Sequence, residues 1–160
     1  MTTYTEADFD GLSWHDCSIW GLEFRVGDFE DDDALSDLAL DIDFIVDWVC
    51  GVGTRPQFRV APASLVFHGV TSLRISLADM HSDYQTALYP LQIRRIERRP
   101  VADQKVYLDR RYDAWTIHLN TPSPGEIHFG AVAFTQRLRA DPVLIESQRL
   151  SFSGRRRGRS

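Results

Sequence analysis

The 160-residue sequence predicts an all-β fold, an antiparallel sandwich or partly closed barrel of about seven to nine strands with little helix. Three observations lead to this prediction. Apolar and polar residues alternate along most of the chain, which is the period of a strand with one buried face. Turn-forming residues interrupt the alternation roughly every 8–14 residues. No stretch longer than about ten residues has the 3.6-residue period of an amphipathic helix.

Two long strands are expected in the first third of the chain, at residues 12–26 and 37–48. The even positions of the first strand are apolar, and a bulge is expected near Asp16 and Ser18. The even positions of the second strand are apolar as well. Its odd positions include four carboxylates, those of Asp37, Asp41, Asp43 and Asp47.

The remaining strands follow in the second part of the chain. They are expected at residues 57–70, 71–77, 88–101, 104–108, 113–120 and 127–139, with a further short strand at 147–152. Pro62 cannot donate a ladder hydrogen bond, so it marks an edge or a bulge. In "FHGVTSLRISL" Gly69 is expected to turn the chain between two scaffold strands, and "TPSPGE" is a further turn.

The alternation also predicts which side chains form the core. The expected core residues are Trp14, Trp20, Leu22, Phe24, Leu40, Ile42, Phe44, Trp48, Phe67, Leu73, Ile75, Trp115, Ile117 and Phe129.

Length and composition indicate one domain over residues 1–152, followed by a disordered basic tail at 153–160. No apolar run approaches the about 20 residues that span a bilayer, so no membrane contact is expected. The acidic N-terminal segment lacks the features of a signal peptide. Cys17 and Cys50 have no CxxC spacing, which favours a reducing, cytoplasmic setting.

Charge is distributed unevenly along the chain. Residues 1–50 hold 14 acidic residues and one arginine, a net charge of −13, whereas residues 51–160 hold 9 acidic and 17 basic residues, a net charge of +8. The arginine-rich second part could bind phosphates. The acidic first third, the sequence pI near 5.5 and the lack of an RNA-recognition or cold-shock motif argue against a nucleic-acid partner.

Several segments resemble those of a family of uncharacterised bacterial proteins. They are "SWHDCSIWGL", "LDIDFIVDW", "FRVAPASLVFHGVTSLRI" and "WTIHLNTPSPGEIHFGAVAFTQRLR". The resemblance covers most of residues 12–150 and implies a single-domain β-fold with no assigned catalytic residue. A shorter likeness, carried by the "HD" strand, is to small bacterial immunity proteins.

Two charged strand faces are candidate binding surfaces. Four carboxylates on one face of residues 37–48 would repel one another unless nearby cations neutralise them. Pairing within the molecule is the favoured interpretation, and a partner's basic surface or Ca²⁺ are the alternatives. The expected internal partners are Arg94, Arg95, Arg98 and Arg99 of "IRRIERR".

A second candidate is a metal site on the hairpin around "TPSPGE". If His118 pairs with His128 across the hairpin, the two imidazoles share a face with Glu126. Two imidazoles and a carboxylate are ligands suited to zinc. Exposed polar side chains on a solvated sheet face are the alternative interpretation, and a slip of one residue in register would separate the pair.

Neither the adjacent His15 and Asp16 nor Cys17 indicates catalysis. Consecutive strand residues point to opposite faces, so His15 and Asp16 cannot chelate one ion without a bulge, and a structural role is expected. No P-loop, dinucleotide-binding motif or nucleophile elbow is present.

We therefore expect a cytoplasmic binding protein that uses a charged sheet face against a protein partner and needs no cofactor. The alternative is a metal-binding module or metal-dependent enzyme centred on His118 and His128.

Overall fold

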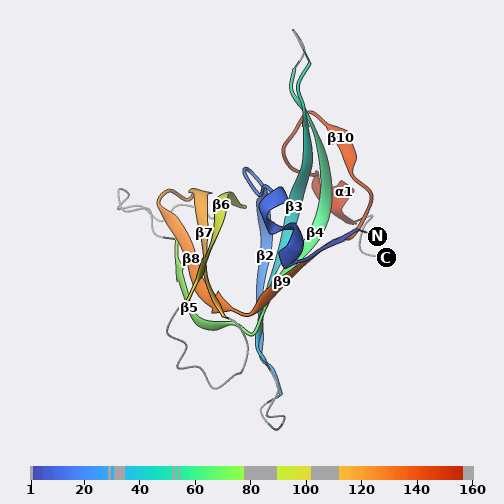
Figure 1. Cartoon of the computed structure of the whole chain (residues 1–160). Coiled ribbons are helices and arrows are strands. Elements are labelled where there is room, and N and C mark those ends of the chain that lie inside the picture. The colour runs from blue at the N-terminus through green and yellow to red at the C-terminus, as the bar shows by residue number, and fades with distance from the viewer. Residues whose placement is uncertain are drawn as a thin grey trace.

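The computed structural model describes residues 2–28, 30, 35–51, 53, 55–77, 90–101 and 112–156. Within them, ten strands form one antiparallel sheet that does not close into a barrel, which confirms the predicted all-β class (Figure 1). The strands are β1 (Thr3–Tyr4), β2 (Ser18–Arg25), β3 (Asp37–Val49), β4 (Gln57–His68), β5 (Thr71–Ser76), β6 (Leu91–Pro100), β7 (Asp113–Thr121), β8 (Gly125–Ala131), β9 (Ala133–Leu138) and β10 (Val143–Ile145). A 3₁₀-helix, η1 (Glu6–Gly11), and a short helix, α1 (Phe152–Arg156), complete the described elements.

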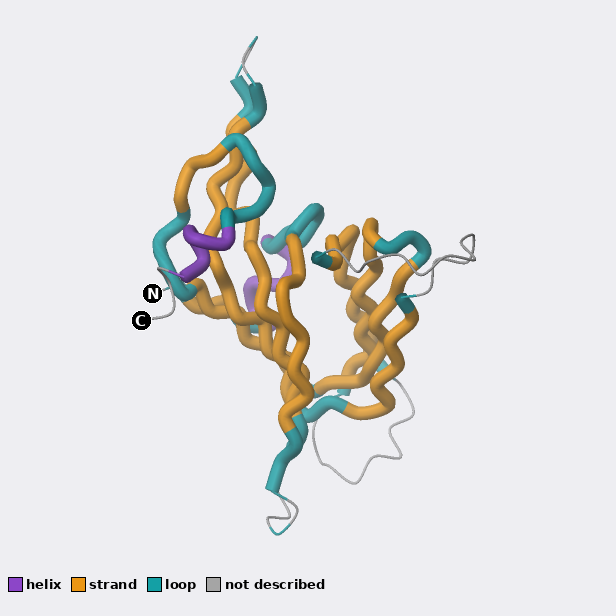
Figure 2. The backbone as a smooth tube through the Cα atoms, turned by 180° about the vertical axis from the view of Figure 1, so that it is seen from behind, coloured by secondary structure: helices purple, strands orange, loops and turns teal. Residues whose placement is uncertain are grey.

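The sheet folds over on itself into two wings. The order of the strands is β1-β9-β4-β3-β2-β6-β7-β8-β5, with β10 on β4. We call β1, β9, β4, β3, β2 and β10 the first wing and β6, β7, β8 and β5 the second wing; both are visible in Figure 2. Between β2 and β6 only two residue pairs form, Ser18 with Gln92 and Ile19 with Leu91, so the wings separate beyond this joint.

At the other end of the molecule the chain crosses between the wings at two corners. Gly69 and Val70 join β4 to β5, and Val132 joins β8 to β9. Gly69 has a φ of +64°, and a Cβ there would lie 3.1 Å from Cγ2 of Val132. A glycine is therefore needed both for the left-handed backbone and for the close approach of the two corners. Its predicted role as a turning point is confirmed.

Aromatic rings fill the space between the wings. The Phe67 ring of β4 lies 4.7 Å from Phe129 of β8 and 5.1 Å from Trp115 of β7, measured between ring centroids. Phe134 of β9 packs against Trp115 at 5.8 Å. Tilted and edge-to-face contacts at these separations are favourable beyond their buried area. The two wings are thus held face to face by one aromatic core.

The core prediction was correct for eight residues and wrong or incomplete for the rest. Buried as expected are Trp14, Leu40, Ile42, Phe44, Phe67, Trp115, Ile117 and Phe129. Leu73 and Trp20 are half-buried. Exposed against expectation are Leu22, Phe24, Trp48 and Ile75.

Two features explain three of these four exposed residues. Beyond Ile19, β2 pairs with no described strand of the second wing, so Leu22 and Phe24 lie where the wings separate. A bulge between Ile45 and Asp47 interrupts the alternation in β3 before Trp48, which is 45% exposed. A bulge of this kind reverses the face that each later residue presents.

Several other predicted boundaries differ from the structure. The strand expected at 147–152 does not form: β10 lies earlier in the chain, residues 146–151 are bends and irregular backbone, and α1 begins at Phe152. The tail expected from residue 153 is helical as far as Arg156, because Arg155 is buried against the sheet, and residues 157–160 lie outside the described residues. The expected strand at 104–108 also lies outside them. No helix in the described part of the chain has the length and apolar character needed to cross a membrane.

Candidate functional site

The carboxylate of Asp43 is completely buried in the middle of β3. It accepts hydrogen bonds from Nε1 of Trp20 at 2.8 Å and from the backbone N–H of Leu150 at 2.9 Å, and Arg155 donates to its other oxygen. Burial raises the pKa of Asp43, while the two N–H donors and the Arg155 charge act in the opposite direction. This buried carboxylate fastens the C-terminal segment to the sheet.

The other three carboxylates of the predicted acidic face have different surroundings. Asp41 accepts hydrogen bonds from both Arg139 and Arg155. Asp37 lies 3.2 Å from Nδ1 of His68. Asp47 is exposed beyond the bulge, opposite Arg59 on β4. Asp41 and Asp43 are therefore paired with arginines within the molecule, but with Arg139 and Arg155 and not with the expected arginines of β6.

The four arginines of β6 do not share one face. Arg95 and Arg99 lie opposite His118 and Ala114 of β7. Arg98 lies over the Phe9 ring at 4.6 Å and packs toward the core, and Arg94 lines a small recess beside η1. Register shifts on either side of Ile93 break the alternation on which the prediction depended.

The hairpin of β7 and β8 has a different register from the predicted one. His118 lies opposite Glu126, and His128 lies opposite Thr116, so the two histidines share a face but are diagonal neighbours. Nε2 of His118 is 2.9 Å from Glu97 and its Nδ1 is 3.2 Å from Glu126, while Nδ1 of His128 is 3.0 Å from the hydroxyl of Thr116. No group of three His, Cys, Asp or Glu side chains within the described residues has a geometry suited to a metal ion.

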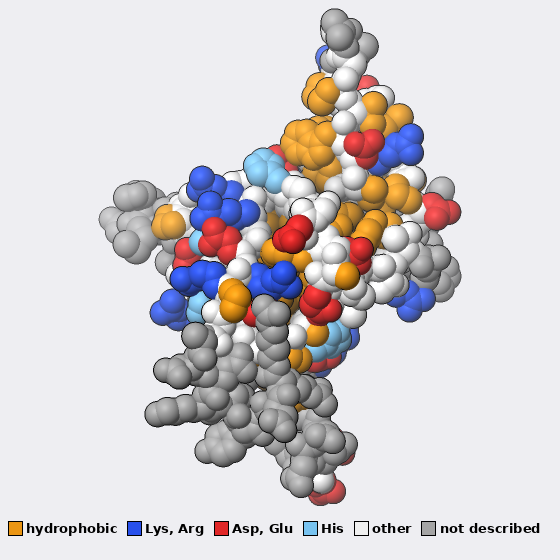
Figure 3. Space-filling model, in the orientation of Figure 1, with side chains coloured by type: hydrophobic (Ala, Val, Ile, Leu, Met, Phe, Trp, Pro, Cys, Tyr) orange, Lys and Arg blue, Asp and Glu red, His pale blue; other side chains and the backbone are white. Residues whose placement is uncertain are grey.

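These side chains belong to a continuous polar surface on the outside of the second wing, which we call the outer face. Cross-strand pairing arranges it in two rows that run over β6, β7, β8 and β5. Its members are Arg74, Arg95, Glu97, Thr116, His118, Glu126 and His128. Side chains of both charges and histidines gather over this wing in Figure 3. The His118 contact is the main cause that lowers the pKa of Glu97.

Tyr112 adds an aromatic ring next to this surface. A Cβ at Gly130 of β8 would lie 1.8 Å from the Tyr112 hydroxyl oxygen, so the ring occupies the place that any other side chain would take. Glycine in a strand often marks such a close approach. The alternation of the strands did not point to Tyr112, and Gly130 within a strand was the one signal for it.

The turn before β2 has the structural role expected for His15 and Asp16. Asp16 has a φ of 64°, a left-handed conformation that aspartate adopts more readily than most residues. Its carboxylate accepts hydrogen bonds from Asn120 of β7 and from Gln148 of the C-terminal segment, both at 2.9 Å. Asp16 thus ties the second wing to the segment that follows β10.

Cys17 is buried, and its sulfur accepts a hydrogen bond from the backbone N–H of Ile45 at 3.4 Å. Burial raises the pKa of the Cys17 thiol to about 12. A thiol in this state is a poor nucleophile.

Comparison of the chain with protein-family profiles, with curated proteins and with solved structures finds no match.

Proposed function

We propose that the protein is a non-enzymatic binding protein that contacts a protein partner through the outer face. The observation that carries the proposal is the contrast in solvent exposure between the carboxylates of β3 and the charged residues of the outer face. Asp41 and Asp43 are neutralised by Arg139 and Arg155 within the molecule. On the outer face, Arg95 and Glu126 remain more than half exposed.

The composition of the outer face supports a protein as the partner. It combines arginines with histidines and carboxylates, and Tyr112 lies beside it. Arginine and tyrosine are enriched at protein interfaces, where mixed charges provide specificity and a faster association rate. The two free cysteines fit a reducing compartment, so we propose the cytoplasm as the location.

Site-specific photocrosslinking in native cells tests this proposal. A photoreactive residue in place of His128 should yield a crosslinked product with one partner protein. The same residue in place of Glu23, an exposed position on β2 of the first wing, should not yield that product.

Charge reversal provides the matched control. Arg95→Glu should abolish the crosslink from position 128, since charged groups at an interface contribute both affinity and register. Arg94→Glu makes the same change at an exposed position off the outer face and should leave the crosslink intact. Equal products from positions 128 and 23, or no product from 128, would overturn the proposal.

A further inference from the structure

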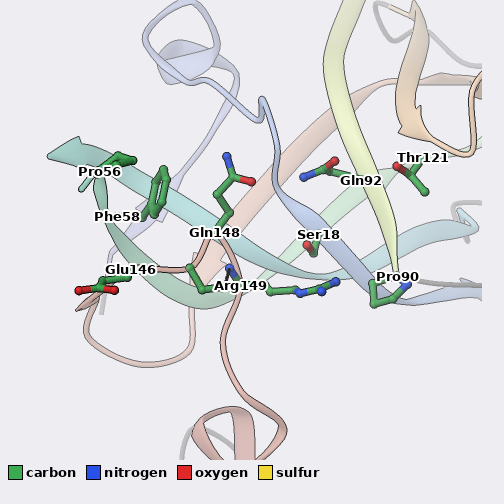
Figure 4. A pocket seen from close by; sticks show the side chains of 10 residues that line it. Ser18, Pro56, Phe58, Pro90, Gln92, Thr121, Glu146, Gln148 and Arg149 are labelled. Carbon is green, nitrogen blue, oxygen red and sulfur yellow. Dashed lines mark hydrogen bonds between the residues drawn. The ribbon is translucent and has the colours of Figure 1, made fainter. Parts of the chain in front are cut away.

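A pocket of about 710 Å³ lies where the C-terminal segment crosses the joint between the wings. Its size is in the range of small-molecule sites. Figure 4 shows side chains from five separate parts of the chain around it. They come from the starts of β2, β4 and β6, the end of β7 and the segment after β10, and include Ser18, Phe58, Gln92, Thr121 and Arg149.

Ser18 is the first indication that the pocket is built for a ligand. The residue is only 4% exposed, and it is held in the sheet by pairing with Asp43 on one side and Gln92 on the other. Its side chain lines the pocket, and no described residue forms a hydrogen bond with its hydroxyl. The hydroxyl opens onto the pocket and is not used within the described part of the protein, so it is available to form a hydrogen bond with a ligand atom.

Arg149 is the second indication. Its guanidinium extends along the pocket toward Ser18 and Pro90 in Figure 4. The nearest arginines on either side of it in the sequence, Arg139 and Arg155, both bind Asp41, whereas no described residue accepts a hydrogen bond from the Arg149 side chain. A planar guanidinium without an internal partner is a natural binding group for a carboxylate or phosphate.

The two ends of the pocket differ in character. Phe58 and Pro56 form an apolar wall at one end, and Glu146 lies beside them near Arg55. At the other end lie the guanidinium of Arg149 and the hydroxyl of Ser18. Glu146 is already paired with Arg55, whereas Arg149 has no such partner among the described residues, so the anionic end of an elongated ligand lies at the Arg149 end.

We infer that this pocket binds a small organic anion, a carboxylate or phosphate monoester with an apolar part. The oxyanion accepts hydrogen bonds from Arg149 and Ser18, and the apolar part packs against Phe58 and Pro56. The Gln92 and Gln148 side chains turn their N–H groups toward Asp16, which leaves their carbonyl oxygens to accept from hydroxyl groups of the ligand. The site is distinct from the outer face, and its occupancy does not depend on the proposed protein partner.

Phenyl phosphate is a suitable probe, with phenol as the control that lacks the anion. Calorimetric titration should show saturable binding of phenyl phosphate and none of phenol at the same concentrations. Amide resonances of Ser18 and Gln92 should shift during the titration. Fluorescence provides a further readout, since the Trp48 ring lies 5.0 Å from Phe58.

Three variants locate the binding. Arg149→Gln should weaken phenyl phosphate binding at least about tenfold, and Ser18→Ala about fivefold, because hydrogen bonds to charged groups are among the stronger ones. Arg94→Gln removes the same charge from an exposed position outside the pocket and should leave the affinity unchanged. Absence of saturable binding at phenyl phosphate concentrations up to about 10 mM would overturn the inference, because even a site with a Kd of about 1 mM would be mostly occupied at that concentration. Equal affinity in the Arg149→Gln and Ser18→Ala variants and the unmodified protein would overturn it as well.

Discussion

Arg155 donates a hydrogen bond to the buried carboxylate of Asp43, across 112 positions of sequence. The Asp43 side chain is inaccessible to solvent and that of Arg155 is 10% exposed. The guanidinium also reaches Asp41, and its central carbon lies 5.0 Å from the centroid of the Trp20 ring. The contact fixes the end of the described chain against the middle of β3.

Loss of the Arg155 charge should therefore destabilise the fold strongly. Removing one partner of a buried ion pair costs about 3–5 kcal/mol, and the slight exposure of Arg155 places Arg155→Gln near the lower end, about 3 kcal/mol. The measurement is urea denaturation of the variant. Arg149→Gln is the matched control, since Arg149 is exposed, and its free energy of unfolding should change by about 0.5 kcal/mol or less. Similar losses in both variants would show that Arg155 is not specifically paired.

The two cysteines should differ in reactivity toward Ellman's reagent. Cys17 is buried with its thiol pKa raised to about 12, while Cys50 is exposed. The native protein should release one equivalent of chromophore rapidly and the second only after denaturation, because the thiolate is the reactive form. In the Cys50→Ser variant the rapid phase should disappear. A rapid phase that persists in this variant would contradict the burial of Cys17.

On the outer face, His118 should hold the pKa of Glu97 below the ordinary glutamate value of 4.5. Since the folded-state pKa is below the unfolded one, Glu97 stabilises the fold above the unfolded pKa. This contribution is lost as the pH falls through the lower folded-state value. Carboxyl NMR titration should show the Glu97 pKa rising in His118→Asn, because the hydrogen bond to His118 is lost.

The control for this titration is His128→Asn. The His128 ring contacts Thr116, not Glu97, so the Glu97 pKa should stay where it is in the unmodified protein. A rise of the same size in both variants would mean that the general charge of the face, and not the His118 contact, sets the value.

The position of the core can be tested by two truncations of the same residue type. Phe67 is 1% exposed between the wings, whereas Phe24 of β2 is 46% exposed. Phe67→Ala should cost about 3–5 kcal/mol in denaturant melts, and Phe24→Ala less than about 1 kcal/mol. A loss of about 3 kcal/mol or more in Phe24→Ala would place β2 against the second wing along its whole length.

Local pattern predicted the strands well, because alternation reports which face of a strand is buried. It placed Leu40, Ile42 and Phe44 correctly in β3. It was wrong at Trp48, because the bulge before it depends on pairing with β4, a distant segment. The β3 sequence contains no glycine or proline that would mark this bulge.

The candidate sites were harder to predict than the strands. Repulsion among the β3 carboxylates indicated that cations must lie nearby, but charge alone does not say which ones. Arg139 and Arg155 reach Asp41 only because β9 and α1 come to lie near β3. No feature of the sequence predicted the pocket, because Ser18 and Arg149 are ordinary polar residues until folding brings their segments together.

The attachment of the C-terminal segment to the sheet depends on the coupling between Asp43 and Arg155, which a double-mutant cycle measures. The free energies of unfolding of Asp43→Asn, Arg155→Gln and the double variant should be non-additive by about 1–3 kcal/mol, since the residues share a buried contact. The same cycle with Arg95→Gln, which replaces an arginine paired with Glu97, should be additive within about 0.5 kcal/mol. Additivity of Asp43→Asn with Arg155→Gln, or equal coupling to Arg95→Gln, would contradict a specific buried pairing of Asp43 with Arg155.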